Sequence, residues 1–315
     1  MNRMRGLVIL GAFVALGLVD PHATLAHNGS SRERAQERQQ APSRVDTTFA
    51  FNRTGVVDLT HTSGDVIVTA SERGEARVRA YAERGRVRWD FSSSRISVDV
   101  EPVRGRVGDS RIEVSVPVGV RVVARSRSGD VSVRGTRGAV DARSHSGDVI
   151  VTDATERVML ESVSGDVRAS QLTGEVRAES VSGTIEARDV TGNIHAETTS
   201  GDVSLAGVTS SSVYVETVAG EIEYEGNIDA SGRYEFRAHS GDVRLGIPEN
   251  SSAQFSVQTY SGALDTAFPL TLLPGQRTTG RPRRFEFTLG GGGARVTAES
   301  FSGDIVLTRR TGANR

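Results

Sequence analysis

Aspartates that follow glycine at regular intervals are the residues of this sequence best placed to do chemistry. Asp130, Asp148, Asp166 and Asp202 each come directly after a glycine and are separated by multiples of 18 residues. If the chain stacks with that period, neighbouring carboxylates lie about 5 Å apart. Such a pair can act as acid and nucleophile in a retaining glycosidase. Carboxylate oxygens also bind Ca²⁺, and Asp148 and Asp166 are the calcium candidates.

A structural role explains the same aspartates more simply. Aspartate beside glycine commonly accepts a backbone N–H in a tight turn. Catalysis needs one differentiated pair, whereas this row is uniform and is interrupted by Thr184. We therefore predict a protein that is not an enzyme, with no catalytic residue, cofactor or metal. A polysaccharide-acting β-helix enzyme, a lyase or hydrolase using these aspartates, is the alternative.

Glycines mark the corners of the repeat. Glycine enters positive φ without steric penalty, and a period this short is typical of an elongated repeat architecture. Wider spacings after residue 201 indicate that the coils grow toward the C-terminus, where Gly262 comes between two further corners. The predicted structural corner glycines are Gly129, Gly147, Gly165, Gly183, Gly201, Gly241 and Gly303.

Apolar residues between the corners alternate with period two, which is the signature of a strand. Val131 and Val133 recur with conservative changes every 18 residues, and a second set, beginning with Val140 and Ala142, comes nine residues later. The sequence therefore predicts an all-β, β-solenoid-like repeat with two short strands per coil of about 18 residues. Longer strands cap its N-terminal end. An antiparallel meander with glycine turns would show the same alternation and stays open.

Serines continue the inward positions of this alternation. Ser144 and Ser180 are expected to face inward, followed by Ser146 and Ser182, so that two hydroxyl ladders run through the interior. Stacked hydroxyls can donate to one coil and accept from the other. On this interpretation, Ser164→Leu overpacks the core.

A row of glutamates faces outward beside the second strand of each coil. One interpretation is a solvated face of mixed charge, and the other is a broad, flat, polar binding surface. Both are compatible with the pattern. The row consists of Glu161, Glu179, Glu197 and Glu216, with Arg143 leading it.

The beginning of the chain has the composition of a secretory signal. Arg3 and Arg5 precede an apolar stretch, and small residues suitable for cleavage end at Ala26. The apolar stretch is too short to span a bilayer, and no transmembrane segment is predicted in the mature chain. The predicted segments are a signal peptide at 1–26, a flexible polar linker at 27–45, a β-rich cap at 46–125, and the repeat at 126–315 with an insertion near 266–294.

Composition excludes two classes of protein. The formal net charge is −1, which argues against nucleic-acid binding. The chain has no cysteine, so neither a disulfide framework nor a lipoprotein anchor is available.

The corners together with the C-terminal motifs resemble the DUF4097 family of bacterial exported β-repeat proteins, described as putative adhesins. The motifs are Ser240-Gly241-Asp242-Val243, Tyr260-Ser261-Gly262-Ala263 and Ser302-Gly303-Asp304-Ile305, and the resemblance covers most of residues 46–315. It implies a β-solenoid-like domain at the cell envelope and a role in adhesion, with no catalytic residues to transfer. We expect an exported protein of the periplasm or cell surface whose partners are envelope polysaccharide or other envelope proteins. Self-assembly into a structural envelope element is a further alternative.

Overall fold

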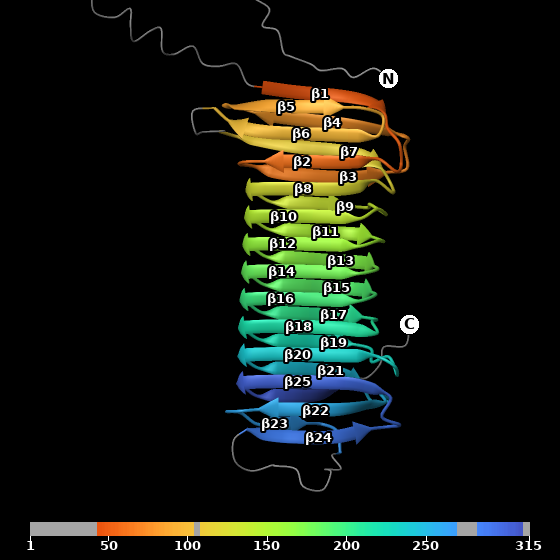
Figure 1. Cartoon of the computed structure of the whole chain (residues 1–315), viewed down its shortest axis with the longest axis vertical. Helices are drawn as coiled ribbons and strands as arrows, with labels where there is room; N and C mark the ends of the chain where they lie inside the picture. The colour runs from red at the N-terminus through yellow and green to blue at the C-terminus, as the bar shows by residue number, and fades with distance from the viewer. Residues whose placement is uncertain (1–42, 104–107, 270–281, 311–315) are drawn as a thin grey trace, which may run out of the picture.

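The protein is a tall column of two sheets that face each other (Figure 1). The structure is a computed structural model that describes residues 43–103, 108–269 and 282–310. Each sheet has 13 strands, and the described residues contain no helix, which confirms the all-β class. At the usual strand spacing, a sheet of this size is about 58 Å long. The predicted signal peptide lies outside the described residues, as does all but the last part of the predicted linker.

The strands alternate between the two sheets along most of the chain. In chain order, the first sheet contains β1 (Ser43–Ala50), β3 (Asp65–Ser71), β4 (Glu75–Ala82), β7 (Ser110–Pro117), β9 (Val131–Arg134), β11 (Val149–Ala154), β13 (Val167–Thr173), β15 (Ile185–Thr191), β17 (Val203–Val208), β19 (Ile222–Gly226), β21 (Val243–Pro248), β23 (Leu264–Thr266) and β26 (Ile305–Arg310).

The second sheet carries the surface described below. In chain order it contains β2 (Val56–His61), β5 (Gly85–Phe91), β6 (Arg95–Pro102), β8 (Arg121–Ser128), β10 (Val140–Ser146), β12 (Val158–Ser164), β14 (Val176–Ser182), β16 (Ile194–Ser200), β18 (Ser212–Ala219), β20 (Arg233–Ser240), β22 (Ala253–Thr259), β24 (Arg283–Leu289) and β25 (Ala294–Ser302).

Equivalent residues of successive coils pair in parallel, so the repeat is a solenoid. Val140 pairs with Val158 in the second sheet, and Val149 pairs with Val167 in the first. All sheet neighbours from β8 to β21 are parallel in this way. An antiparallel meander cannot give this register, and that alternative is excluded.

Only one of the two predicted serine ladders is inside. Ser144 and Ser180 are buried, but Ser146, Ser164 and Ser182 are exposed, because the alternation ends where the chain turns into the corner. The prediction of a second internal ladder was therefore wrong, and a leucine at position 164 would not overpack the core.

The buried hydroxyls also bond differently from the prediction. Ser144 Oγ donates to the carbonyl oxygen of Gly129, the corner at the end of the preceding coil, at 2.9 Å. Ser162 Oγ donates in the same way to Gly147 at 3.0 Å. The hydroxyls thus satisfy corner carbonyls instead of bonding to one another, and they tie the inner wall to the corner.

A column of left-handed residues adds a row of core positions that the sequence pattern did not predict. Asp153, Gln171 and Asp189 have φ of 56°, 55° and 54°, and Gly135 and Gly207 occupy the same column. The positive φ reverses the alternation locally, so that the next residue of each coil faces inward. These additional buried residues are Thr136, Ala154, Leu172, Val190 and Val208.

Antiparallel strands close the N-terminal end, in agreement with the predicted cap. β4 lies antiparallel between β1 and β7, and β5 is antiparallel to β6. Phe49 and Trp89 stack on either side of Phe91, with ring centroids 5.2 Å and 4.8 Å away. These aromatic rings cover the end of the core between the two sheets.

At the C-terminal end the coils do not stack in chain order. β25 pairs with β20 and β26 pairs with β21, whereas β22, β23 and β24 lie beyond them. The corner at Gly303 therefore stacks on Gly241, and Gly262 stacks outside Gly303. Spacing along the chain could not reveal this reversal. The centre of the predicted insertion, residues 270–281, lies outside the described residues.

Candidate functional site

The predicted corner glycines lie where successive coils approach most closely. A Cβ atom added at Gly147 would lie 2.4 Å from the carbonyl oxygen of Gly129, and one at Gly165 would lie 2.2 Å from that of Gly147. The φ of both residues is 155°, a region that favours glycine. Gly183 lacks a positive φ but has the same close approach, at 2.1 Å. Similarly close contacts of 2.1 to 2.3 Å are found at Gly129, Gly201 and Gly303, and one of 1.9 Å at Gly241.

The corner aspartates form a hydrogen-bonded ladder along the column. Asp130 Oδ1 accepts the backbone N–H of Asp148 at 2.8 Å, and Asp148 Oδ1 accepts that of Asp166 at 2.9 Å. Asp166 Oδ1 accepts the N–H of Thr184 at 3.0 Å, where the side-chain ladder is interrupted. Each of these aspartates thus accepts a hydrogen bond from the next coil, 18 residues along the chain. The sequence had predicted a hydrogen bond within the turn itself.

Arg168 lies between the two calcium candidates. Its guanidinium donates to Asp148 Oδ2 at 2.6 Å and to Asp166 Oδ2 at 2.7 Å. Partial burial opposes ionisation of Asp148, yet the hydrogen bonds from Arg168 and from the Asp166 amide hold the pKa of Asp148 below its usual value. All four carboxylate oxygens of the pair have a donor from the chain, so a calcium ion would have to displace Arg168.

The aspartates are therefore brought together as predicted from their spacing, but their carboxylates are hydrogen-bonded to backbone amides and to Arg168. A nucleophile and an acid need different environments, and these two carboxylates share one guanidinium and equivalent backbone bonds. Among the described residues, no three side chains of His, Asp or Glu come together to form a metal-binding group.

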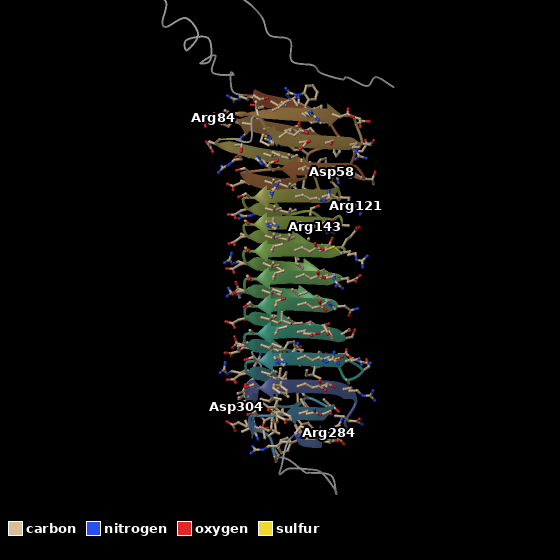
Figure 2. All side chains as sticks on the ribbon, turned by 60° about the vertical axis from the view of Figure 1, so that its left-hand side comes forward. Asp58, Arg84, Arg121, Arg143, Arg284 and Asp304 are labelled. Carbon is tan, nitrogen blue, oxygen red and sulfur yellow. The ribbon has the colours of Figure 1, made fainter. Side chains whose placement is uncertain are left out.

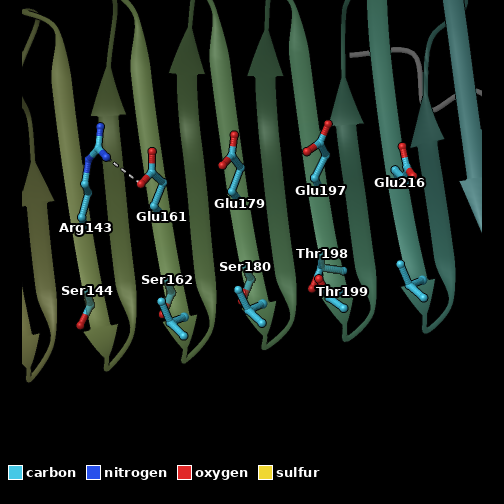
Figure 3. A pocket seen from close by; sticks show the side chains of 13 residues that line it. Arg143, Ser144, Glu161, Ser162, Glu179, Ser180, Glu197, Thr198, Thr199 and Glu216 are labelled. Atoms are coloured by element: carbon cyan, nitrogen blue, oxygen red, sulfur yellow. Dashed lines mark hydrogen bonds and ion pairs between the residues drawn. The ribbon is translucent and has the colours of Figure 1, made fainter.

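A groove of about 390 Å³ runs along the outer face of the second sheet (Figure 3). It crosses β10, β12, β14, β16 and β18. The last four strands contribute the same two outward positions to its walls, and β10 contributes Arg143. One wall is the predicted outward row of Arg143, Glu161, Glu179, Glu197 and Glu216. Parallel pairing holds the members of this row side by side on neighbouring strands.

Each of these glutamates has one partner from the chain. Glu161 Oε2 accepts a hydrogen bond from Arg143 at 2.8 Å, and Glu197 Oε1 lies 2.6 Å from His195 Nε2. Glu179 Oε1 pairs with Arg177, and Glu216 Oε2 accepts from Tyr214. The second oxygen of each carboxylate accepts no hydrogen bond from the described part of the chain. The row therefore keeps acceptor capacity toward the groove.

The other wall of the groove is an exposed apolar column that the sequence prediction missed. It consists of Val163, Val181 and Val218, with Thr199 at the equivalent place on the coil between the last two. Their side chains point out because each follows the buried Ser or Thr of its strand, just before the corner. The outward phase of the alternation could have identified this column. The predicted flat polar surface is thus a groove with one acidic and one apolar wall.

Aromatic residues extend the same column toward the C-terminal end. His239, Phe301 and Tyr260 follow Val218 on successive coils, and their rings stack with centroid separations of 5.0 Å and 4.8 Å. All the large hydrophobic residues that are exposed in the described structure belong to this one column: Val163, Val181, Val218, Tyr260 and Phe301. We call the whole set, with Thr199 and His239, the apolar column.

Charged side chains project from the column along its length in the view of Figure 2, including Arg84 near one end and Asp304 and Arg284 near the other. Many of these side chains form ion pairs between neighbouring strands, such as Arg111 of β7 with Asp65 of β3. The apolar column is thus an exception on this surface.

Comparisons with known proteins give a family and a fold. The family model described as Toastrack DUF4097 matches residues 90–196 and 173–308. No curated protein matches the chain significantly. A solved structure titled "putative lipid binding protein", from Parabacteroides distasonis, is 10% identical over 85% of this chain and 97% of its own, with a TM-score of 0.45.

Two other solved structures are similar at the same low level. A "putative adhesin" from Bacteroides fragilis is 10% identical over 84% of this chain and 97% of its own, with a TM-score of 0.37. A "putative cell adhesion protein" from Clostridium sporogenes is 8% identical over 85% of this chain and 100% of its own, with a TM-score of 0.24. Among the described residues of the present chain, no helix is long and apolar enough to cross a membrane.

Proposed function

Because the chain belongs to the Toastrack DUF4097 family, we propose that it is an exported, non-enzymatic binding protein of the bacterial cell envelope. Its recognition surface is the groove between the glutamate row and the apolar column. The basic and apolar start of the sequence supports export to the periplasm or cell surface. The ligand is an envelope polysaccharide or another envelope protein.

The observation that carries this proposal is the clustering of exposed apolar side chains in one column. Single exposed apolar side chains are common on soluble proteins, but a contiguous apolar patch on a water-exposed surface commonly marks an interaction site. Here the patch is continuous along several coils and borders a row of carboxylates with free acceptor capacity. A surface built only for solubility would carry charged residues at these positions.

The corner aspartates support the non-enzymatic part of the proposal. Their oxygens are used to hold one coil on the next, and Arg168 neutralises the pair that chemistry would need. A carboxylate engaged in this way is a poor nucleophile because both of its oxygens are held by hydrogen bonds that an attack on a substrate would have to weaken. Function is therefore assigned to the outer face of the second sheet.

The test is retention of envelope fractions by immobilised protein, with and without variants of the groove. Val181→Thr and Glu179→Arg introduce residues that the chain already uses at equivalent coils, Thr199 and Arg143, so the fold should tolerate them. Glu223→Arg makes the same charge change on the exposed face of β19 in the first sheet and is the matched control.

We expect the wild type and the control to retain polysaccharide or protein from the envelope, and the double groove variant to lose at least nine-tenths of it. Equal retention by all three proteins would refute the assignment of the groove. Sugar release from the polysaccharide that Asp148→Asn abolishes would instead support the enzyme alternative. Detection of a mature N-terminus at His27 in an exported fraction tests the export step.

A further inference from the structure

We propose that the groove binds a basic amphipathic α-helix of a protein partner, lying parallel to the long axis of the column. This inference rests on the proposed function and names the partner class for the same surface. It depends on three properties of the groove: its repeat distance, its charge and the arrangement of its apolar column.

The repeat distance of the groove matches that of a helix. Successive coils are about 4.8 Å apart, and an α-helix rises 5.4 Å per turn. Over the coils from Glu161 to Glu216, three intervals amount to about 14 Å, against about 16 Å for three helical turns. Flexible side chains can absorb this difference of about 2 Å. A helix can therefore present one basic and one apolar residue to each coil.

The two walls of the groove also match two adjacent rows of a helix. Glu179 and Val181 are two residues apart on one strand, so the acidic and apolar columns lie about 7 Å apart. A helix with its side chains is about 10–12 Å across, so two adjacent rows on its buried face can reach both walls. A helix with leucine-like residues on one row and arginine or lysine on the next can fill both walls together, as in other helix-in-groove complexes.

Charge determines which amphipathic partner is suitable. Four glutamates line the groove, and the permanent cations beside them are Arg143, Arg177 and, at the next place of the row, Arg237. Arg237 is itself paired with Glu235 and Glu299, so the groove keeps an excess of carboxylates. The free oxygen of each carboxylate can accept a charge-assisted hydrogen bond from the partner. The same row repels anionic headgroups, so a lipid surface does not fit although the apolar column alone would suit one.

The aromatic part of the apolar column favours a protein partner over a sugar. Phe301 has its two faces covered by His239 and Tyr260, in nearly parallel stacking at 5.0 Å and 4.8 Å. Sugar recognition by stacking needs a free ring face, whereas Phe301 offers mainly its edge. The exposed ring edges instead provide apolar contact area for aliphatic side chains of a partner helix that lies along the column.

An extended partner strand fits less well than a helix. Its side chains on one face repeat every 6.8 Å or so, about 2 Å more than the coil spacing, and the accumulated mismatch exceeds one coil spacing by the fourth residue on that face. The drift for a helix is about 0.6 Å per turn. The geometry thus selects the helix among polypeptide conformations.

The experiment uses the full mature chain and a synthetic 18-residue peptide with leucine and arginine on adjacent helical rows. A second peptide differs from the first only by a proline at its centre, which prevents a continuous helix. Binding is measured by calorimetry at two salt concentrations. We expect the helical peptide to bind at least tenfold more tightly than the proline peptide, and more weakly at high salt.

The groove variants locate the binding. Glu179→Arg and Val181→Thr should each weaken the helical peptide at least fivefold, and Glu223→Arg should leave its Kd unchanged. Circular dichroism checks the fold, and Glu197→Gln replaces Glu179→Arg if that variant does not fold. Equal binding of the two peptides, no binding of either, or equal losses in the groove and control variants would each overturn the inference.

The outcomes also separate this inference from the proposed function. Envelope polysaccharide that binds in a groove-dependent way, with no difference between the peptides, would overturn the helix but keep the groove as the recognition surface. Binding of vesicles with anionic lipid through the groove would overturn the charge argument and the helix with it. Loss of every groove dependence would refute both proposals.

Discussion

Replacing Gly147 by alanine tests whether the corners are what holds successive coils together. The new methyl group would lie 2.4 Å from the carbonyl oxygen of Gly129 and 2.6 Å from its carbonyl carbon. Ordinary carbon contacts lie near 3.5 Å or beyond, so the two coils must separate locally by about 1 Å. That shift weakens the bond from Ser144 Oγ to Gly129, at 2.9 Å, and the bond from the Asp148 amide to Asp130, at 2.8 Å.

The expected loss of stability combines these effects. Each weakened hydrogen bond contributes about 1 kcal/mol, and a side chain held at φ 155°, in a region that almost only glycine occupies, costs roughly 1–3 kcal/mol. We therefore expect Gly147→Ala to lower the free energy of unfolding by about 3–5 kcal/mol. Gly183→Ala has the close contact without the positive φ and should lose about 2 kcal/mol.

The assay is urea unfolding followed by far-ultraviolet circular dichroism, with fluorescence of the single tryptophan, Trp89, as a second probe in the N-terminal cap. Gly74→Ala is the matched control, because an added Cβ there meets no atom within 4 Å. The control should change stability by less than about 0.5 kcal/mol. A Gly147→Ala variant as stable as Gly74→Ala would refute the role assigned to the corner.

Three further predictions concern other parts of the column. Burial lowers the pKa of His61 to about 4 despite the nearby Asp65, so the unfolded chain, with a pKa near 6.5, takes up the proton first. This residue should therefore contribute up to about 3 kcal/mol of stability above pH 6.5 that is lost as the pH falls toward 4, and urea unfolding at several pH values should show a smaller loss in His61→Ser. Gln171→Gly removes a side chain from a residue at φ 55° and should raise the free energy of unfolding by about 1 kcal/mol, although a new glycine in a strand usually lowers it. A thermal midpoint below that of the wild type would contradict this prediction. Millimolar Ca²⁺ should leave the melting temperature unchanged because Arg168 and backbone amides occupy Asp148 and Asp166; a rise that Asp148→Asn removes would restore the metal-site hypothesis.

The regular part of the fold was predictable because each coil repeats the same local solution. Val131, Val149 and Val167 stack on like neighbours at the register that their spacing predicts. The serines after the strand were harder to place, because period-two alternation ends at the corner and Ser146 turns outward. The left-handed column was hidden for a related reason: Gln171 has no sequence feature that indicates a positive φ.

Long-range order at the C-terminal end could not be derived from local spacing. Whether the coil of Gly303 or that of Gly262 stacks on Gly241 depends on which strands pair, and both have similar corner motifs. In the groove, the glutamate row was predicted correctly as outward. Its apolar neighbours Val163 and Val181 were overlooked because an outward valine in a strand resembles an ordinary strand residue until it is compared with the same position on every other coil.

The most direct test of the account is chemical footprinting at single cysteines on the two outer faces. The natural chain has no cysteine, so Val181→Cys in the groove and Glu223→Cys on the first sheet each give one reactive thiol. Their rates of maleimide labelling are compared with and without the bound envelope fraction. We expect the ligand to slow labelling at position 181 at least fivefold and to leave the rate at position 223 unchanged. Equal rates at position 181 with and without a retained ligand would contradict it.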